Sequence, residues 1–143
     1  MRALGLDLGA KRIGVAVSDP DGRLATPADV LYRTGDRARD HRAIVGLVRE
    51  WEVEVVVVGV PYSLDGGTGP AAEEMLAESS DLAALLDVPV ETHDERLTTV
   101  TAAQQLREAG LDERAQRRVV DQVAAAVLLQ SWLDGRRGGV DDA

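Results

Sequence analysis

The feature that most constrains the fold is an almost unbroken run of valines, VEVVVVGV, at residues 53–60. Only Glu54 and Gly59 interrupt it. A strand that is apolar on both faces is typical of a parallel sheet whose two sides are covered by helices. We therefore expect an α/β domain in which this strand is buried.

The rest of the chain supplies strands and helices in an order that fits such a domain. Alternating apolar and polar residues predict strands at 3–8 and 13–18, joined as a hairpin by a tight turn at 9–12. The next strand contains Pro27, which marks an edge or an irregularity. The other expected elements are that strand at 24–32, helices at 36–51 and 70–86, a strand at 88–93, and helices at 98–110 and 112–134. We expect the strands at 53–60 and 88–93 to lie parallel to the first.

Apolar residues at helical spacing predict the buried sides of the helices at 36–51 and 70–86. Asp36 is placed to cap the first of these helices. His41 lies on this surface-type helix and is expected to have no functional role. The expected buried stripes are Ile44, Leu47, Val48 and Trp51 on the first helix, and Met75, Leu76, Leu82, Leu85 and Leu86 on the second.

Length and composition exclude several kinds of protein. The 143 residues fit one domain, expected at 1–134, with a disordered tail at 135–143. The absence of cysteine excludes disulfides and thiolate metal sites. No apolar run reaches the roughly 18 residues that a membrane span requires. The amino terminus does not have the layout of a signal peptide. We therefore expect a cytoplasmic protein with no membrane contact.

The charge is distributed unevenly along the chain. The net charge of −9 argues at first against binding nucleic acid. However, residues 52–95 hold eleven acidic residues and no Lys or Arg, whereas residues 1–51 hold nine basic and seven acidic residues, net +2. Basic residues also cluster at Arg37, Arg39 and Arg42, and at Arg114, Arg117 and Arg118. Solvated helix faces would explain both clusters.

Three acidic residues stand where separate apolar segments end. They are Asp7 in ALGLDLG, Glu95 in HDERLTT and Asp121 in VVDQVAAAVLL. Asp7 is expected at the carboxyl end of a strand, where α/β sheets usually build their sites. Carboxylates are costly to bring together unless a cation lies between them. The pattern therefore indicates a metal site.

Each of these acids also has a purely structural interpretation. Asp7 could bond to its own backbone in the hairpin turn. Glu95 could form a loop ion pair or lead into the following helix, and its neighbour Asp94 is an alternative for the metal-facing carboxylate. Asp121 could be a solvated residue at the margin of the apolar stripe of its helix. The occurrence of all three together is more specific than any one of them.

Carboxylate oxygens are the ligands that Mg²⁺ or Mn²⁺ prefers. Two such ions can activate a water and stabilise the leaving oxygen of a phosphodiester, so that no serine, histidine or cysteine nucleophile is needed. His93 precedes the acidic pair and could assist proton transfer, although a lone histidine at a strand end is more often structural.

Four motifs resemble, in order and spacing, those of the YqgF/RuvX-type proteins, known as pre-16S rRNA nucleases or Holliday junction resolvases. The motifs are GLDLGAKRIGVAVSD, VVVVGVPYSLDGG, HDERLTT and VVDQVAAAVLLQSWL, and the resemblance spans roughly residues 3–134. It implies an RNase H-like α/β fold, which is a mixed five-stranded sheet flanked by helices. It also implies a nuclease that uses two divalent ions, Mg²⁺ or Mn²⁺, and cleaves structured nucleic acid in the cytoplasm.

The resemblance also implies roles for individual residues. The acidic catalytic and metal-binding site falls on Asp7, Glu95 and Asp121. Lys11, Arg12 and Arg96 match basic positions that would meet phosphates. Arg117 and Arg118, close in sequence to Asp121, are further candidates for nucleic-acid contact. The acidic middle of the chain suggests that only one face of the molecule meets the substrate. Precursor rRNA and branched DNA both remain open as substrates.

Two other functions compete with this one. The fragment DLGAKRIGVAV also resembles the phosphate-binding hairpin of actin-like ATPases and sugar kinases, but those proteins need two such domains around a nucleotide. Alternatively, the chain could be a non-catalytic RNase H-like module that binds nucleic acid. The exposed side of the last helices could serve a homodimer, which nothing in the sequence requires.

Overall fold

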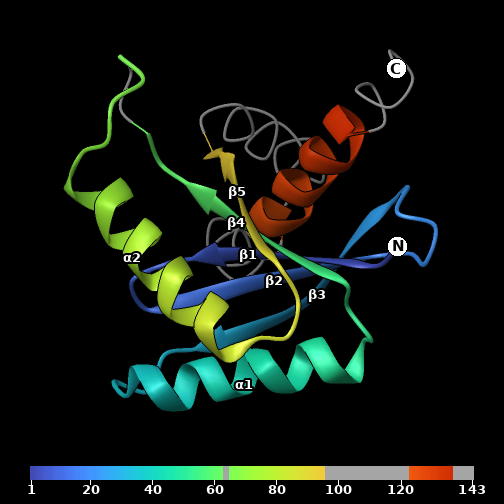
Figure 1. Cartoon of the computed structure of the whole chain (residues 1–143), viewed down its shortest axis with the longest axis horizontal. Coiled ribbons are helices and arrows are strands. Elements are labelled where there is room, and N and C mark those ends of the chain that lie inside the picture. The colour runs from blue at the N-terminus through green and yellow to red at the C-terminus, as the bar shows by residue number, and fades with distance from the viewer. Residues whose placement is uncertain (63–64, 96–122, 137–143) are drawn as a thin grey trace, which may run out of the picture.

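The computed structural model describes residues 1–62, 65–95 and 123–136. One five-stranded sheet forms the centre of the molecule, with strand order β3-β2-β1-β4-β5 (Figure 1). Its strands are β1 (Ala3–Leu8), β2 (Arg12–Ser18), β3 (Ala25–Tyr32), β4 (Val55–Val60) and β5 (Val90–Asp94). The described helices are α1 (Arg37–Glu50), α2 (Pro70–Leu85) and an unlabelled helix at 123–136, red in Figure 1.

The directions of the strands confirm the expected topology. β2 runs antiparallel to β1 and to β3, and β4 runs parallel to both β1 and β5. α1 connects β3 to β4, and α2 connects β4 to β5. The carboxyl ends of β1, β4 and β5 therefore meet at one edge of the sheet, namely the edge formed by the strand ends and not by an outermost strand.

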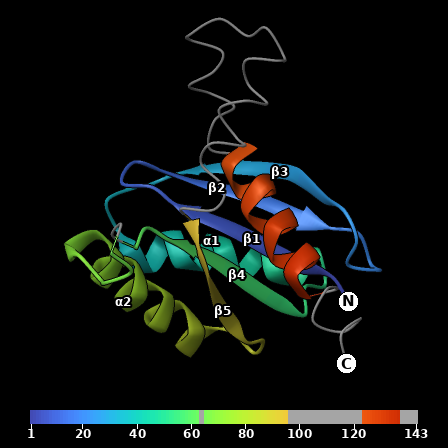
Figure 2. The same cartoon turned by 90° about the horizontal axis from the view of Figure 1, so that it is seen from above.

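The valine run forms the buried strand that the sequence predicts. All six residues of β4 are buried, and alternate valines belong to two separate cores. Val56 and Val58 pack in the core beneath α1 and α2, whereas Val55 and Val57 pack against helix 123–136. Figure 2 shows α1 and α2 on one side of the sheet and this last helix on the other. Helices thus cover both faces, which explains why the run has no polar side.

The third strand is at an edge of the sheet, as Pro27 predicts. It pairs only with β2, and the register of that pairing shifts between Val15 and Ala16. A proline cannot donate a hydrogen bond to a neighbouring strand, so an edge position with a local irregularity suits it.

The first helix begins and ends close to the expected residues. The Asp36 side chain caps it by accepting a hydrogen bond from the Arg39 amide. However, His41 itself is buried on this surface-type helix, with only 2% of its surface exposed. It lies at helical spacing from buried Ile44 and Val48 and therefore shares their face.

The buried side of α2 also differs from the expected stripe. Leu82 is fully buried and Met75 packs against the same core, but Leu85 is 52% exposed. Glu78 and Ser79 are buried instead. Helical geometry explains this, because Glu78 lies three residues after Met75 and four before Leu82.

Several expectations lie outside the described residues. They concern the helices at 98–110 and from 112 to 122, and the tail beyond residue 136. Helix 123–136 itself extends two residues past the predicted end of the domain. Among the described residues, no helix has the length and apolarity to cross a membrane.

Candidate active site

Asp7 is the second-last residue of β1, where it pairs with Gly14 of β2. The register of the parallel strands aligns Leu6 with Val58, and Val58 with Thr92. Asp7 therefore lies one residue closer to the carboxyl ends of the strands than the aligned residues Leu6, Val58 and Thr92. Neighbouring strands are about 4.8 Å apart, so Asp7 lies roughly 10 Å from the backbone of β5, counted across β4. Carboxylate side chains can span much of that distance.

Asp7 faces the side of the sheet covered by helix 123–136. Alternation along β1 gives Asp7 the face of Gly5, and a Cβ atom at Gly5 would lie 2.8 Å from Leu129 Cβ and 3.1 Å from the Ala125 carbonyl oxygen. Real Cβ atoms essentially never come within 3.0 Å of a neighbour. The absence of a side chain at residue 5 therefore lets this helix contact the strand that carries Asp7. Asp121 stands four residues before Ala125 in the sequence.

The two acids after β5 occupy different positions. Asp94 is the last residue of the strand and pairs with Val60, and Glu95 follows it directly. Alternation gives Asp94 the face opposite to that of His93. Burial raises the pKa of the Glu95 carboxyl above its ordinary value. A cation beside Glu95 would offset this effect by favouring the charged form.

His93 connects β5 to helix 123–136. It pairs with Gly59 of β4, and its Nε2 atom lies 2.9 Å from Ser131 Oγ, within hydrogen-bonding distance. Burial lowers the pKa of the imidazole, and the charge of Asp94 acts in the opposite direction. This contact supports a structural role, in which His93 holds the end of β5 against the same helix that Asp7 faces.

Lys11 and Arg12 are carried by the turn that follows Asp7. Lys11 is exposed in this turn, and Arg12 is the first residue of β2. The turn is tight, because the Gly9 amide donates to the Asp7 carbonyl at 3.0 Å and a Cβ at Gly9 would lie 2.5 Å from the Arg12 carbonyl oxygen. Both basic residues are therefore at the same edge of the sheet as Asp7.

A largely buried ionic cluster is hydrogen-bonded to this turn. The sequence analysis did not predict it. Arg33 Nε donates to the Gly9 carbonyl at 2.7 Å, and its two terminal nitrogens donate to the Glu78 carboxylate at 2.9 and 2.8 Å. His41 Nε2 also donates to Glu78, at 2.8 Å. Burial acts to raise the pKa of Glu78, but the hydrogen bonds from Arg33 and His41 outweigh it, so the pKa lies below its ordinary value.

The helical spacing of His41 and Glu78 was the signal that could have revealed this cluster. Each lies on the apolar side of its own helix, and the two residues are 37 positions apart in sequence. A buried acid opposite a buried histidine and an arginine satisfies the rule that buried charges are paired. The cluster ties α1, α2 and the turn at Gly9 together.

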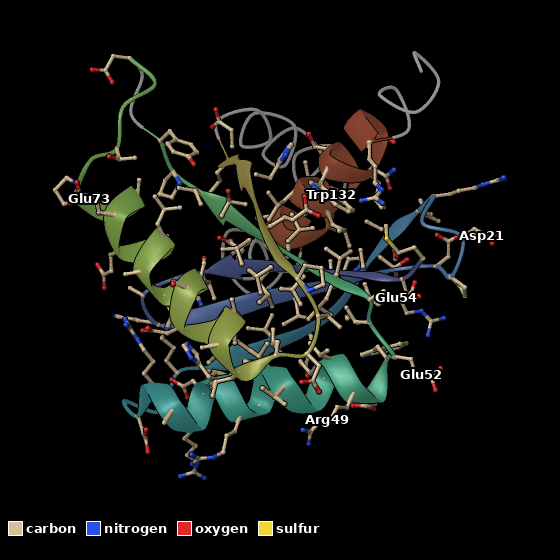
Figure 3. All side chains as sticks on the ribbon, in the orientation of Figure 1. Asp21, Arg49, Glu52, Glu54, Glu73 and Trp132 are labelled. Atoms are coloured by element: carbon tan, nitrogen blue, oxygen red, sulfur yellow. The ribbon has the colours of Figure 1, made fainter. Side chains whose placement is uncertain are left out.

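Part of the predicted site lies outside the described residues, namely Asp121, Arg96, Arg117 and Arg118. Within 1–62, 65–95 and 123–136, no group of three or more Asp, Glu or His side chains is arranged to hold a metal ion. The described part of the predicted triad consists of Asp7 and Glu95. Figure 3 shows that Asp21, Glu52 and Glu54 lie at the opposite edge of the sheet, away from the arrowheads of β1, β4 and β5.

Comparison with known proteins identifies the family. The family model described as "RuvX: Holliday junction resolvase" matches residues 1–135. A protein of Mycobacterium sp. (strain KMS), named "Putative pre-16S rRNA nuclease", is 49% identical over 140 residues, which cover 97% of this chain and 83% of that protein. A protein of the same name from Rhodococcus opacus (strain B4) is 49% identical over 144 residues, covering 98% and 81%.

Solved structures support the fold. Thermus thermophilus RuvC in complex with a Holliday junction substrate has a TM-score of 0.60 at 19% identity, covering 96% of each chain. The Holliday junction resolvase of fowlpox virus has a TM-score of 0.55 at 10% identity, covering 94% of this chain and 99% of that one. The expected RNase H-like sheet flanked by helices is thereby confirmed. The chain belongs to the RuvX family, whose members are described as Holliday junction resolvases and pre-16S rRNA nucleases.

Proposed function

We propose that this protein is a metal-dependent endonuclease that hydrolyses phosphodiester bonds of structured nucleic acid. The observation that carries the proposal is the position of Asp7. Its carboxylate is at the edge of the sheet where β5 delivers Glu95, and it faces the helix that follows Asp121 in the sequence. Carboxylates from three separate segments would then converge.

The donor set suits Mg²⁺ or Mn²⁺. Asp7, Glu95 and Asp121 offer only carboxylate oxygens, which these hard cations prefer to nitrogen or sulfur ligands. Burial raises the pKa of Glu95, and a bound cation would favour its charged form. Two bound ions would supply an activated water and stabilise the leaving oxygen.

The basic residues of the chain would hold the substrate. Lys11 and Arg12 are next to Asp7 in sequence and at the same sheet edge, where phosphates on either side of the cleaved bond would meet them. Arg96, Arg117 and Arg118 are proposed as further phosphate contacts from their positions in the sequence. The exposed acids at the opposite edge of the sheet disfavour nucleic acid there. The substrate would therefore approach from the side of Asp7.

The names of the relatives and the family model indicate two substrates, pre-16S rRNA, for which the family resemblance implies the 5′ end, and the Holliday junction. We propose that the chain cleaves one or both of them in the cytoplasm. A homodimer would suit the two-fold symmetry of a junction. The description of the family model favours branched DNA, whereas the names of the two relatives given above favour precursor rRNA.

The test is cleavage of a labelled precursor rRNA fragment and a labelled four-way DNA junction, with Mg²⁺ or Mn²⁺. Asp7→Asn should abolish cleavage while nucleic-acid binding stays largely intact, and chelation of the metal should stop the wild-type reaction. Asp21→Asn removes the same charge at the far edge of the sheet and should leave cleavage unchanged. Cleavage that survives Asp7→Asn would contradict the proposal. Wild-type binding without cleavage would favour the non-catalytic module.

A further inference from the structure

A groove of about 560 Å³ lies beside the turn that follows Asp7. It is formed where this turn, the residues after β3 and the start of α1 come together, and it is lined by Ala10, Lys11, Arg33, Gly35, Arg37 and Asp40. Three of these six residues are cationic and one is acidic. The groove therefore gathers three cations in a chain whose net charge is −9, while Glu78 pairs with Arg33 and Glu74, Glu78 and Asp81 lie within 4.0 Å of Arg37.

The first two cations of the groove differ in how they are held. Lys11 is exposed, whereas the guanidinium of Arg33 is fixed by hydrogen bonds. Within the described part of the chain, the structure gives Lys11 no ion pair. Arg33 is held by the Gly9 carbonyl and by the buried carboxylate of Glu78, and these bonds use three of its five N–H groups. Its side chain remains 16% exposed on the groove side of the cluster.

Arg37 is the third cation that lines the groove. Its side chain is 45% exposed, and its nitrogens lie 3.8–4.0 Å from Glu74, Glu78 and Asp81. These distances are too long for hydrogen bonds, and Glu74 and Asp81 are themselves exposed. Exposed ion pairs of this kind are weak, so the guanidinium can turn toward a phosphate at small cost.

The acidic residue in the wall does not prevent anion binding. Asp40 is buried, and its carboxylate accepts hydrogen bonds from the Thr34 amide at 3.1 Å and the Thr34 hydroxyl at 2.8 Å. The Asp40 carboxylate is therefore engaged in hydrogen bonds that stabilise the turn before α1. Among the lining residues Asp40 is one acid against three cations, and the acids that face these cations from α2 are Glu74, Glu78 and Asp81.

We propose that this groove binds a backbone phosphate of the nucleic acid, with Lys11 and Arg37 as its contacts and Arg33 as a further cation of the lining. The proposal rests on the nucleic-acid substrate of the proposed function, but not on cleavage. The groove adjoins the turn next to Asp7. The bound nucleic-acid strand would therefore continue from the acidic site across this turn toward the start of α1 (Figure 1).

The test compares two arginines of the same helix. Arg37→Gln and Arg42→Gln each remove one positive charge from an exposed position of α1, but only Arg37 lines the groove. Binding of a fluorescent four-way DNA junction and of a precursor rRNA fragment would be measured by anisotropy in Ca²⁺ at several salt concentrations. Both variants should give the circular dichroism spectrum of the wild type.

We expect Arg37→Gln to weaken binding about tenfold and to reduce the salt slope by about one, as loss of one phosphate contact does. Arg42→Gln should stay within about twofold of the wild type. Equal effects of the two variants on binding, or no effect of Arg37→Gln, would refute the proposal that the groove binds a phosphate. Tight binding that depends on Arg37 in a protein that does not cleave would support the groove and refute the nuclease function.

Discussion

Glu78, between α1 and α2, and Glu95, at the end of β5, are both withdrawn from water, yet their pKa values move in opposite directions. At Glu78, hydrogen bonds from Arg33 and His41 outweigh burial and lower the pKa. At Glu95, burial raises it. The first carboxylate pairs with cations of the fold, whereas the second is the one that we propose as a metal ligand. The comparison separates a structural acid from a candidate catalytic one.

The largest expected effect on stability belongs to Glu78→Ala. Removing this carboxylate leaves the buried His41 and the partly buried Arg33 without their partner, and breaking a buried pair typically costs about 3–5 kcal/mol of unfolding free energy. Urea unfolding followed by circular dichroism would measure it. Glu74→Ala, an exposed acid on the same helix, should change stability by less than about 0.5 kcal/mol. Similar losses for both would show that the buried cluster does not stabilise the fold.

Glu95→Gln should have the reverse profile, with little loss of stability and a large loss of cleavage. Changing residues that merely support metal ligands costs about 10–100-fold, so loss of a ligand should cost about 100-fold or more. Stability should stay within about 1 kcal/mol of the wild type, because no buried charge is left unpaired. Asp94→Asn is the matched control and should retain more activity. If Asp94→Asn is the inactive variant instead, Asp94 is the metal-facing acid.

The smallest expected effect is on the pH dependence of stability, and it has opposite signs at the two sites. Because the pKa of Glu78 is lowered on folding, its contribution is present above the unfolded value of about 4.5 and is lost as the pH falls through the folded pKa. Because the pKa of Glu95 is raised, its contribution becomes unfavourable as the pH rises from about 4.5 through the folded pKa.

Urea unfolding between about pH 3 and pH 7 would test these signs. Relative to the wild type, Glu78→Gln should lose less stability on acidification. Glu95→Gln should gain stability near pH 7, and this gain should vanish below about pH 4.5. Parallel curves for the two variants would refute the contrast between the two glutamates.

The sequence was sufficient for the sheet because the relevant signals are local. The valine run at 53–60 predicts a buried parallel strand, and Pro27 predicts an edge. Alternation around Asp7 and the end of the strand before Glu95 predict a shared sheet edge, which the register agrees with. These predictions depend on period and on turn residues rather than on distant partners.

The buried cluster could not be predicted in the same way. A histidine and a glutamate among apolar residues reduce the apparent amphipathicity of their helices, so that Leu85 seems a better core residue than Glu78. Their burial depends on one another and on Arg33, which lies outside both helices. Only the three-dimensional packing of α1 against α2 and the turn brings these charges together, and pairing then removes the cost of burying them.

The close contact at Gly5 has a consequence for how the chemistry can be altered. This residue carries no functional group, yet it determines how near the last helix can come to the strand that presents Asp7. A single added methyl group there would widen the space between them, and we expect it to alter which ions the proposed carboxylate ligands can bind. A search for variants with changed metal preference should therefore begin with the smallest residue of the strand, well before any charged side chain is exchanged.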